Sequence, residues 1–389
     1  MKKRQLASIS VVLAFASLAH ADDNPLAFPV TPPSVDAASW VLMDATTGQV
    51  LTQGNADERR NPASLTKLMT GYVVDRAIDA KRITRDDMVT IGQDAWGAGN
   101  PVFKGSSLMF LKPGEKVSVR DLSRGVIIDS GNDACVALAD YVAGSQSAFV
   151  DQMNQYVTKL GLTNTHFETV HGLDAPGQFT TAGDLAKLSR AIISGEPDFY
   201  QMYGEKSLTW NGITQQNRNG LLWDKTLHVD GLKTGHTESA GFNIIASSVD
   251  GQRRLIAVIM GGKSTKGREE QARKLLTWGQ NNFDTVQLFH AGKEIGHENV
   301  WYGNPHQVSV GSDKDVYLAL PRDEVKKIKA KYVIDRKDLE APLKAHEQVG
   351  SIQLVDGDKT LASYPLVALQ EVKEAGIITR IEDYIKQKL

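Results

Sequence analysis

The spacing of apolar positions predicts two groups of strands, far apart in the chain, with helices between them. Alternating apolar residues favour strands over residues 39–43 and 49–53, joined by a turn at Thr46-Thr47-Gly48. Later strands are expected over Gly231 to Thr234, Phe242 to Ser248 and Leu255 to Met260, with a hairpin turn at Asp250-Gly251. Because the two groups must bury their apolar faces together, the pattern predicts one sheet assembled from distant segments.

Between these strands the apolar period becomes helical. From Pro62 to Ile78, apolar side chains recur along one face, and Asn61-Pro62 is a suitable helix start. The members of this face are Leu65, Leu68, Met69, Tyr72, Val73 and Ala77. A mostly helical middle section follows, and the further helices are expected over Asp133 to Val142, Thr181 to Ile193 and Arg268 to Asn281. The expected class is an α+β domain over residues 22–282.

After about Asn282 the pattern changes to short alternating strands separated by Gly, Asp and Pro. The strands expected there are Gln307 to Val310, Val316 to Leu320, Gly350 to Val355 and Ser363 to Leu369. We therefore predict a small, separate β-domain over residues 283–372 and a tail over residues 373–389.

The tail contains a short amphipathic helix from Gly376 to Leu389. Its apolar side consists of Ile377, Ile378, Ile381, Tyr384 and Ile385. Such a helix either lies in a membrane surface or packs against its own domain, and the sequence leaves both open.

The first 21 residues have the form of a secretory signal peptide. A basic start (Met1-Lys2-Lys3-Arg4) precedes an apolar run from Leu6 to Leu18 and an Ala19-His20-Ala21 exit. The apolar run is too short to cross a bilayer as a helix. Cleavage after Ala21 removes three positive charges and changes the net charge from −2 to −5, which excludes nucleic acid as a partner.

The single cysteine and the histidines indicate neither thiol nor metal chemistry. Cys135 lies in the apolar stretch Ala134 to Ala139, with no neighbour that would lower its pKa, so we expect a small buried residue. The nine histidines are scattered without ligand spacing, and neither a metal nor a cofactor is expected. Export without an internal disulfide suits a bacterial periplasm.

Three short motifs supply the parts of an acyl-transfer site that has no Ser-His-Asp triad. They are Ser64-Leu65-Thr66-Lys67, Ser130-Gly131-Asn132 and Lys233-Thr234-Gly235. On a helix, Ser64 and Lys67 project from the same face, and a buried amine with a lowered pKa can take the proton of the serine. Ser64 is also expected in the first helical turn, where free N–H groups favour negative charge. Taken alone, Lys67 would be a solvated surface residue.

The other two motifs favour a catalytic role for Lys67 over a position on the surface. Ser130-Gly131-Asn132 lies between two apolar helical stretches, which predicts a tight loop that points into the interior. There the Ser130 hydroxyl can relay a proton to a leaving amine, and the Asn132 amide can hold Lys67. Lys233-Thr234-Gly235 is predicted on an edge strand that can pair with a peptide, with Lys233 and Thr234 binding a carboxylate and Gly235 allowing close backbone approach. Singly, each motif is an ordinary turn or strand end.

These residues resemble the serine D,D-peptidase family of penicillin-binding proteins and β-lactamases, in particular its low-molecular-mass D-alanyl-D-alanine carboxypeptidases. The resemblance runs from about Val35 to the C-terminus. The matching stretches are Pro62-Ala63-Ser64-Leu65-Thr66-Lys67, Ser130-Gly131-Asn132-Asp133-Ala134-Cys135, His171-Gly172-Leu173-Asp174 and Gly231-Leu232-Lys233-Thr234-Gly235-His236-Thr237. It implies a β-lactamase-like domain, an antiparallel sheet with helices, followed by a small all-β domain. It also implies removal of the terminal D-alanine from peptidoglycan stem peptides through an acyl-enzyme on Ser64, which β-lactams would acylate too.

The resemblance also implies roles for residues outside the three motifs. The backbone N–H groups of Ser64 and His236 would form the oxyanion hole. Arg268 would help Lys233 hold the substrate carboxylate, although a charge on the solvent face of a helix is an equal alternative. Arg218 is a weaker candidate for lining the site.

Two departures from the related proteins limit these expectations. The glutamate-containing E-x-x-L-N segment of class A β-lactamases is absent, so rapid release of a β-lactam acyl group is not expected. The family's C-terminal helix usually continues into an aromatic-rich tail, whereas this chain stops at Gln387-Lys388-Leu389. This difference weakens the expectation of peripheral contact with the outer face of the inner membrane.

Other functions are compatible with the same features. A D,D-endopeptidase that cuts peptidoglycan cross-links uses identical catalytic parts. A β-lactam-binding sensor module would need a transmembrane output segment, and no apolar run after residue 21 is long enough. A structural role of the β-domain can coexist with catalysis.

Overall fold

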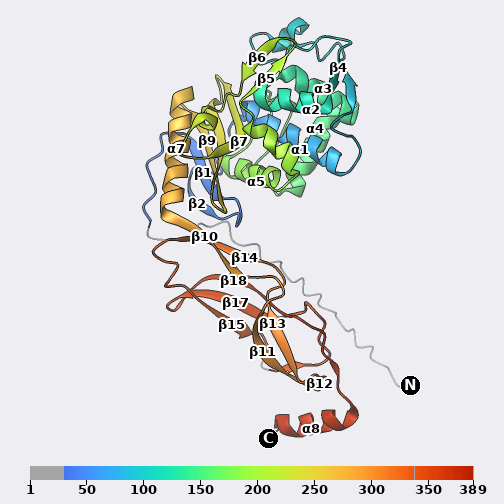
Figure 1. Cartoon of the computed structure of the whole chain (residues 1–389), viewed down its shortest axis with the longest axis vertical. Coiled ribbons are helices and arrows are strands. Elements are labelled where there is room, and N and C mark those ends of the chain that lie inside the picture. The colour runs from blue at the N-terminus through green and yellow to red at the C-terminus, as the bar shows by residue number, and fades with distance from the viewer. Residues whose placement is uncertain (1–29, 337, 389) are drawn as a thin grey trace, which may run out of the picture.

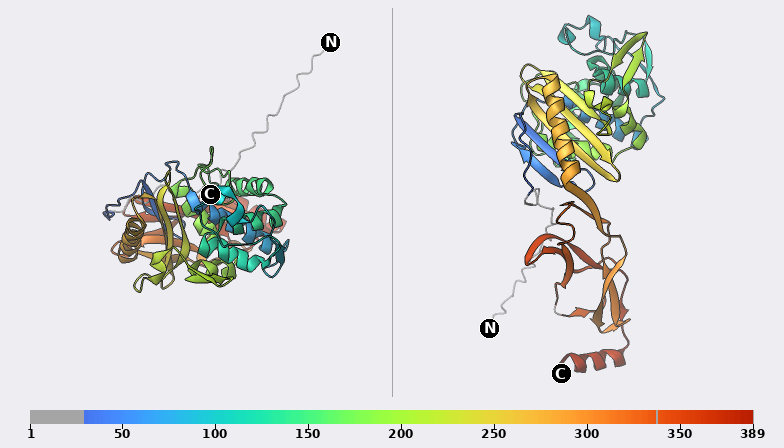
Figure 2. Two further views of the ribbon diagram at one scale, coloured as in Figure 1. Left: turned by 90° about the horizontal axis from the view of Figure 1, so that it is seen from above. Right: turned by 60° about the vertical axis from the view of Figure 1, so that its left-hand side comes forward.

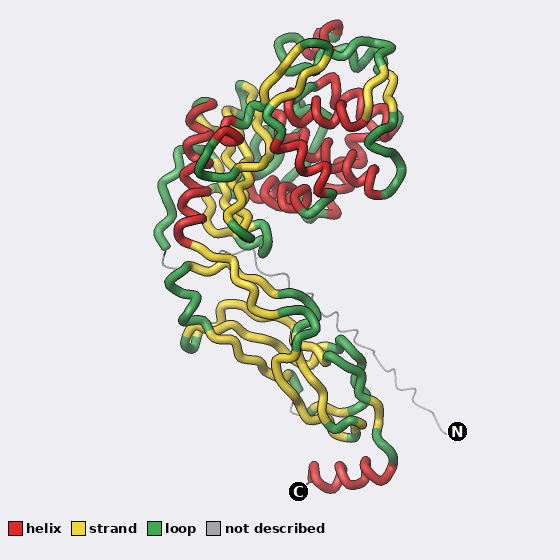
Figure 3. The backbone as a smooth tube through the Cα atoms, viewed as in Figure 1, coloured by secondary structure: helices red, strands yellow, loops and turns green. Residues whose placement is uncertain are grey.

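The computed structural model describes residues 30–336 and 338–388, which form two parts joined end to end (Figure 1). The predicted signal peptide, residues 1–21, lies outside the described residues. Figure 3 shows helices and a sheet in the first part, and mainly strands in the second part up to the final helix. The α+β class with a following all-β domain is confirmed.

The first part is built on a five-stranded antiparallel sheet of order β2-β1-β9-β8-β7. These strands are β2 (Val50–Gly54), β1 (Ser39–Asp44), β9 (Arg253–Gly262), β8 (Gly241–Asp250) and β7 (Val229–Thr237). Leu42 of β1 pairs with Ala257 of β9, so the predicted meeting of distant strands is confirmed. Strand β7, which carries Lys233-Thr234-Gly235, ends the sheet on one side.

Helices cover both faces of this sheet because successive side chains of a strand point to opposite faces. Helix α7 (Thr265–Asn282) runs across one face, where its Leu275 packs with Leu42 and Ile244 (Figure 2). The other face packs against the helical region through Val41 and Ile245. The helices of that region are α1 (Thr66–Asp79), α2 (Val119–Arg124), α3 (Asn132–Ala143), α4 (Gln146–Lys159), α5 (Ala182–Ile193) and α6 (Pro197–Gln201).

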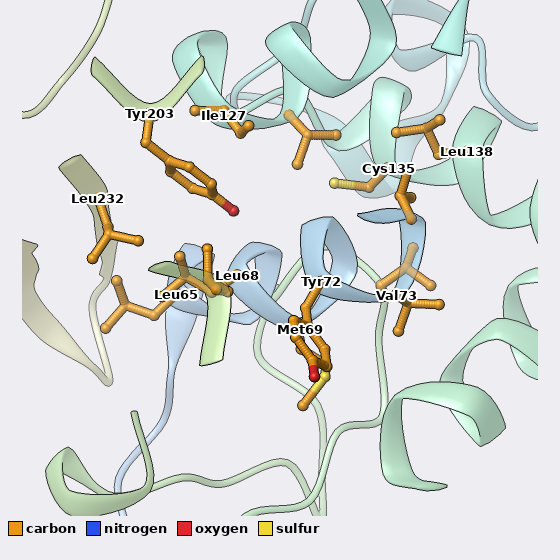
Figure 4. Packing of buried hydrophobic residues seen from close by; sticks show 14 of the residues in the cluster. Leu65, Leu68, Met69, Tyr72, Val73, Ile127, Cys135, Leu138, Tyr203 and Leu232 are labelled. Atoms are coloured by element: carbon orange, nitrogen blue, oxygen red, sulfur yellow. The ribbon is translucent and has the colours of Figure 1, made fainter. Parts of the chain in front are cut away.

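Helix α1 is more deeply buried than its predicted single apolar face suggests. In Figure 4 its apolar side chains lie between Leu232 of β7 and Leu138 of α3. Burial also includes polar residues of α1, among them Lys67 and Thr70. A central helix surrounded by other elements buries every side, so its sequence shows only part of its contacts.

The expectation of a mostly helical middle section was incomplete. Two short antiparallel strand pairs lie within it, β3 (Met88–Thr90) with β4 (Lys116–Ser118) and the hairpin of β5 (Ser207–Trp210) with β6 (Ile213–Gln216). These strands have three or four residues each, too short to show a reliable alternation. The β5–β6 hairpin packs over the segment that leads to Ser130.

The second part has a six-stranded sheet and two two-stranded ones. The sheet order is β15 (Lys329–Ile334), β17 (Gln348–Asp356), β18 (Lys359–Ala368), β13 (Gln307–Gly311), β11 (Glu294–Trp301) and β16 (Leu339–Glu340). The smaller pairs are β10 (Phe283–Phe289) with β14 (Val316–Pro321), and β12 (Gly303–Asn304) with β19 (Lys373–Glu374). Val308, Val310, Ile352 and Leu366 lie in its own apolar core.

Polar contacts link the two parts where α7 runs into β10. The Gln49 amide donates to the Ala319 carbonyl oxygen at 3.0 Å, and Asp284 forms ion pairs with Arg253 and Arg322. The domain boundary that we predict after residue 282 coincides with the end of α7 at Asn282.

The chain ends in helix α8 (Ile377–Lys388), which covers the predicted tail helix. It contacts the β-domain through polar side chains. The buried Asp383 accepts a hydrogen bond from the Tyr302 backbone N–H at 2.8 Å, and the Tyr302 hydroxyl donates to Gln387 at 2.6 Å. The five apolar side chains of α8 are each more than half exposed, and three of them, Ile377, Ile381 and Tyr384, border a shallow pocket with Tyr302.

Candidate active site

A pocket of about 480 Å³ opens between the edge strand β7 and the helical region. Eight of the predicted site residues line it, namely Ser64, Ser130, Asn132, Thr234, Gly235, His236, Arg218 and Arg268. Lys67 and Lys233 lie buried beneath its surface, with exposed fractions of 1% and 3%. The structure thus brings together residues that are far apart in the chain.

Ser64 lies in a tight turn just before α1. The turn is a 3-10 helix (Ala63–Leu65), so Ser64 precedes the first α-helical turn in which we expected it. Ala63 adopts a left-handed conformation with φ of 50°. A Cβ atom on Gly172 would lie 1.9 Å from the Ala63 carbonyl oxygen, and one on Gly235 would lie 3.0 Å from the Ser64 nitrogen. Glycine at these two positions therefore lets neighbouring backbones support the turn that presents Ser64.

The Lys67 amine donates hydrogen bonds to three oxygen atoms. They are Ser64 Oγ at 3.0 Å, Asn132 Oδ1 at 2.7 Å and the His171 carbonyl oxygen at 2.6 Å. Burial lowers the pKa of Lys67 to about 8, and the positive charge of Arg218 lowers it further, against opposing effects of Cys135 and Asp133. About a tenth of the amine is then neutral at pH 7 and able to accept a proton.

Ser130 links the pocket to the second buried lysine. It follows a π-helix (Gly125–Asp129) and has a left-handed φ of 57°, which turns its hydroxyl out of the helical path. Lys233 Nζ donates to Ser130 Oγ at 2.9 Å. Burial and the positive charge of Lys67 both lower the pKa of Lys233.

Asn132, the first residue of α3, ties the Ser130 loop to its surroundings. Its side-chain oxygen accepts from Lys67, and its side-chain nitrogen donates to Ser106 Oγ at 2.8 Å. The tight loop predicted between two helical stretches is confirmed, and it points inward as expected.

Cationic groups gather at the Thr234 end of the pocket. Arg268 is buried and donates to the carbonyl oxygens of Gly235 and Asn243, both at 3.3 Å. Burial lowers the pKa of Arg268 to about 10, so it stays protonated at neutral pH. Arg218 is exposed in the pocket and donates to Ser107 Oγ. Together with Lys233, these groups favour a carboxylate ligand.

His236, the residue after the third motif, is exposed at the pocket rim. Its ring stacks on Phe242 with 4.0 Å between ring centroids. This contact joins the ends of β7 and β8, where His236 pairs with Phe242.

Sequence reasoning missed several groups that complete the site. The His171 carbonyl oxygen, Gly172, Ser106 and Ser107 come from loops with no periodic pattern. The segment His171-Gly172-Leu173-Asp174 resembles the family, but the sequence assigned no catalytic or binding role to its residues. Burial lowers the pKa of the His171 ring to about 3, so this ring is neutral and the residue acts here through its backbone.

Cys135 and the acidic residues add no further reactive group. Cys135 is fully buried, and burial raises the pKa of its thiol to about 11. Within residues 30–336 and 338–388, no three His, Cys, Asp or Glu side chains converge in a group that could hold a metal ion.

The sheet, its helices and the serine–lysine pair define a serine peptidase of the acyl-transfer class. Residues 27–264 match the family described as D-alanyl-D-alanine carboxypeptidase, and residues 283–374 match the penicillin-binding protein 5 C-terminal domain. The chain belongs to the D-alanyl-D-alanine carboxypeptidase family, which confirms the resemblance.

Similar proteins match nearly all of the chain, and similar solved structures match about nine tenths of it. The chain is 66% identical to the D-alanyl-D-alanine carboxypeptidase DacD of Salmonella typhimurium, covering 100% of this chain and 99% of the relative. It is 53% identical to DacA of Escherichia coli, over 99% and 96%. Among solved structures, penicillin-binding protein 6B of Escherichia coli is 63% identical with a TM-score of 0.77, over 90% of this chain and 100% of that one. Penicillin-binding protein 5 of Haemophilus influenzae is 47% identical with a TM-score of 0.86, over 89% and 100%.

Proposed function

We propose that the protein is a serine-type D-alanyl-D-alanine carboxypeptidase that removes the terminal D-alanine from peptidoglycan stem pentapeptides. The observation that carries this proposal is the 3.0 Å contact between Lys67 Nζ and Ser64 Oγ in a pocket with cations at one end. Family membership supports the reaction, and the same serine would be acylated by β-lactams.

Substrate binding uses the edge strand and the cations. The stem peptide pairs with β7 by main-chain hydrogen bonds. Its terminal carboxylate is held by Arg218, Arg268 and Thr234. This places the carbonyl of the penultimate D-alanine over Ser64, with the N–H groups of Ser64 and His236 as donors to its oxygen.

Acylation then proceeds by two proton movements. Neutral Lys67 accepts the proton of Ser64 while Ser64 Oγ attacks the carbonyl carbon. As the C–N bond breaks, Ser130, which contacts Lys233, passes its proton to the leaving nitrogen and D-alanine departs. Ser130 is then reprotonated with the proton that Lys67 took from Ser64, so both residues return to their starting states. A water molecule cleaves the resulting ester and restores Ser64.

The test is a comparison of two substrates with the purified protein. We expect the protein to release D-alanine from a monomeric pentapeptide at least about tenfold faster than it cleaves a cross-linked dimer. Both reactions use the same site, but the free terminal carboxylate of the pentapeptide is the group that fits the cations of the pocket. Mass spectrometry of the products measures both. Faster cleavage of the dimer would establish the endopeptidase alternative and overturn the carboxypeptidase proposal.

We also propose that α8 makes peripheral contact with a membrane surface, as expected for an exported protein at the outer face of the inner membrane. Five apolar side chains of α8 are each more than half exposed, namely Ile377, Ile378, Ile381, Tyr384 and Ile385. Basic residues Lys386 and Lys388 lie in its last turn. Among the helices of the described ranges, none has the length and apolar composition needed to cross a bilayer. A helix of this kind binds by burying its apolar side in the interface.

We expect the protein to sediment with anionic lipid vesicles, and Ile381→Glu to weaken that binding at least about tenfold, because an apolar contact is replaced by a charge. Val333→Glu, at an exposed apolar position of β15, is the matched control and should bind as the unchanged protein does. Wild-type protein that stays in the supernatant would refute the contact.

A further inference from the structure

A carboxylate that the proposed reaction does not use, that of Asp174, is hydrogen-bonded to Thr237 at the edge of the pocket. Asp174 follows Leu173, which lines the pocket, and is exposed. Its two carboxylate oxygens accept hydrogen bonds from Thr237 Oγ1 at 3.0 Å and Ser239 Oγ at 2.6 Å. Thr237 is the last residue of β7 and also lines the pocket. Asp174 therefore lies at the far end of the strand that would hold the substrate.

The direction of the substrate follows from the proposed function, on which this inference rests. A peptide that pairs antiparallel with β7 runs opposite to it, and its carboxyl end lies near Thr234 and Arg268. Its earlier residues then extend past His236 toward Thr237. With about 3.4 Å per residue, the third residue of the stem, one position before the acylated D-alanine, comes beside the end of β7.

We propose that Asp174 binds the side-chain ammonium of the third stem residue, so that the enzyme prefers stems whose third residue is a diamino acid with a free amine. The pocket then has complementary charge at both ends of its ligand: Arg218 and Arg268 face the terminal carboxylate, and Asp174 faces an ammonium.

The surroundings of Asp174 suit a binding group. An ionised carboxylate has about four acceptor positions, and the hydroxyls of Thr237 and Ser239 occupy two of them. These donors fix the orientation of the carboxylate without neutralising its charge. Asn61, which donates to Ser239 Oγ at 2.7 Å, fixes the hydroxyl in turn. Within the described ranges, the ion pairs of the protein do not include Asp174, so its charge is available to a ligand.

The experiment compares kcat/KM for two pentapeptides that differ only at the third residue, one with a free side-chain amine and one with that amine acetylated. We expect wild-type protein to prefer the free amine about fivefold, as for a partly exposed ion pair, and the preference to shrink as salt is added. In Asp174→Asn the ratio of the two values should fall to about one, whereas Asp151→Asn, at an exposed position of α4, should keep it.

The ratio of the two kcat/KM values distinguishes binding of the ammonium by Asp174 from a purely structural role of this residue. If Asp174 only held the loop to β7, its replacement would lower both rates by the same factor and leave the ratio unchanged, and this result would overturn the inference. A wild-type ratio near one would overturn it without any variant. Failure of the wild-type protein to release D-alanine from either peptide would instead refute the proposed function itself.

Discussion

The Ser64→Ala variant is expected to release D-alanine at a rate lower than that of the unchanged protein by a factor on the order of 10⁶, because no other group in the pocket is placed to attack the substrate carbonyl. Ser64 Oγ contacts the buried Lys67 amine at 3.0 Å, and the turn that carries it is supported by Gly172 and Gly235. The variant should also form no covalent adduct with a penicillin, measured by intact mass followed by peptide mapping.

The control for this variant is Ser147→Ala, which removes an exposed hydroxyl from α4 and should leave release and adduct formation unchanged. Thermal unfolding of both variants should stay close to that of the unchanged protein, because in Ser64→Ala the Lys67 amine keeps Asn132 Oδ1 and the His171 carbonyl oxygen as acceptors. Release or acylation that survives in Ser64→Ala would exclude Ser64 as the nucleophile.

Replacing Lys67 by arginine should be nearly as damaging as replacing it by alanine, with each lowering the acylation rate by a factor of about 10²–10⁴. A guanidinium keeps the positive charge but cannot accept a proton at neutral pH. The three acceptors around Lys67 (Ser64, Asn132 and the His171 carbonyl) lie within 3.0 Å of its single amine nitrogen, a geometry that a planar guanidinium does not reproduce. Stopped-flow acylation by a chromogenic β-lactam measures the effect, and Lys112→Arg, at an exposed position, is the matched control.

The pH dependence of acylation reports on the same group. Burial places the pKa of Lys67 at about 8, so the neutral, proton-accepting fraction is small at pH 6, rises through pH 8 and is nearly complete above pH 9. The acylation rate of the unchanged protein should therefore increase through that range and then level off, and neither Lys67 variant should show this rise. A rate that is constant between pH 6 and 9 would contradict a neutral Lys67 as the base.

The fold was predictable where long segments have a clear period. Apolar residues alternate along the strands near residue 40 and residue 255, and they recur at helical spacing after Thr66. These patterns are long enough to show the type of element, and the structure confirms it. Strands β3 to β6 are too short for that. The pairing of β3 with β4 joins strands separated by residues 91–115, which is a tertiary effect, whereas β5 and β6 are joined directly by the Asn211-Gly212 turn.

The site was predictable to the extent that its chemistry lies in side chains within short motifs. The partner of Lys67 at His171 is a backbone carbonyl, and every residue has one, so no pattern could single it out. Likewise, the left-handed turn at Ser130 depends on the π-helix before it. For α8, packing against its own domain was one of the two alternatives, but the burial of Asp383 in that contact was not foreseen, because an acidic residue in a sequence is expected to be exposed.

The pairing of β1 with β9 has a consequence for how the enzyme matures. This contact joins ends of the domain that are far apart in the chain, so the sheet closes late and slowly compared with the local helices. Until it closes, β7 has no fixed place beside Ser64 and the nucleophile has no organised pocket. A chain that has not yet closed the sheet would thus be chemically inert, and the fraction of molecules labelled by a fluorescent penicillin would count those that have finished folding.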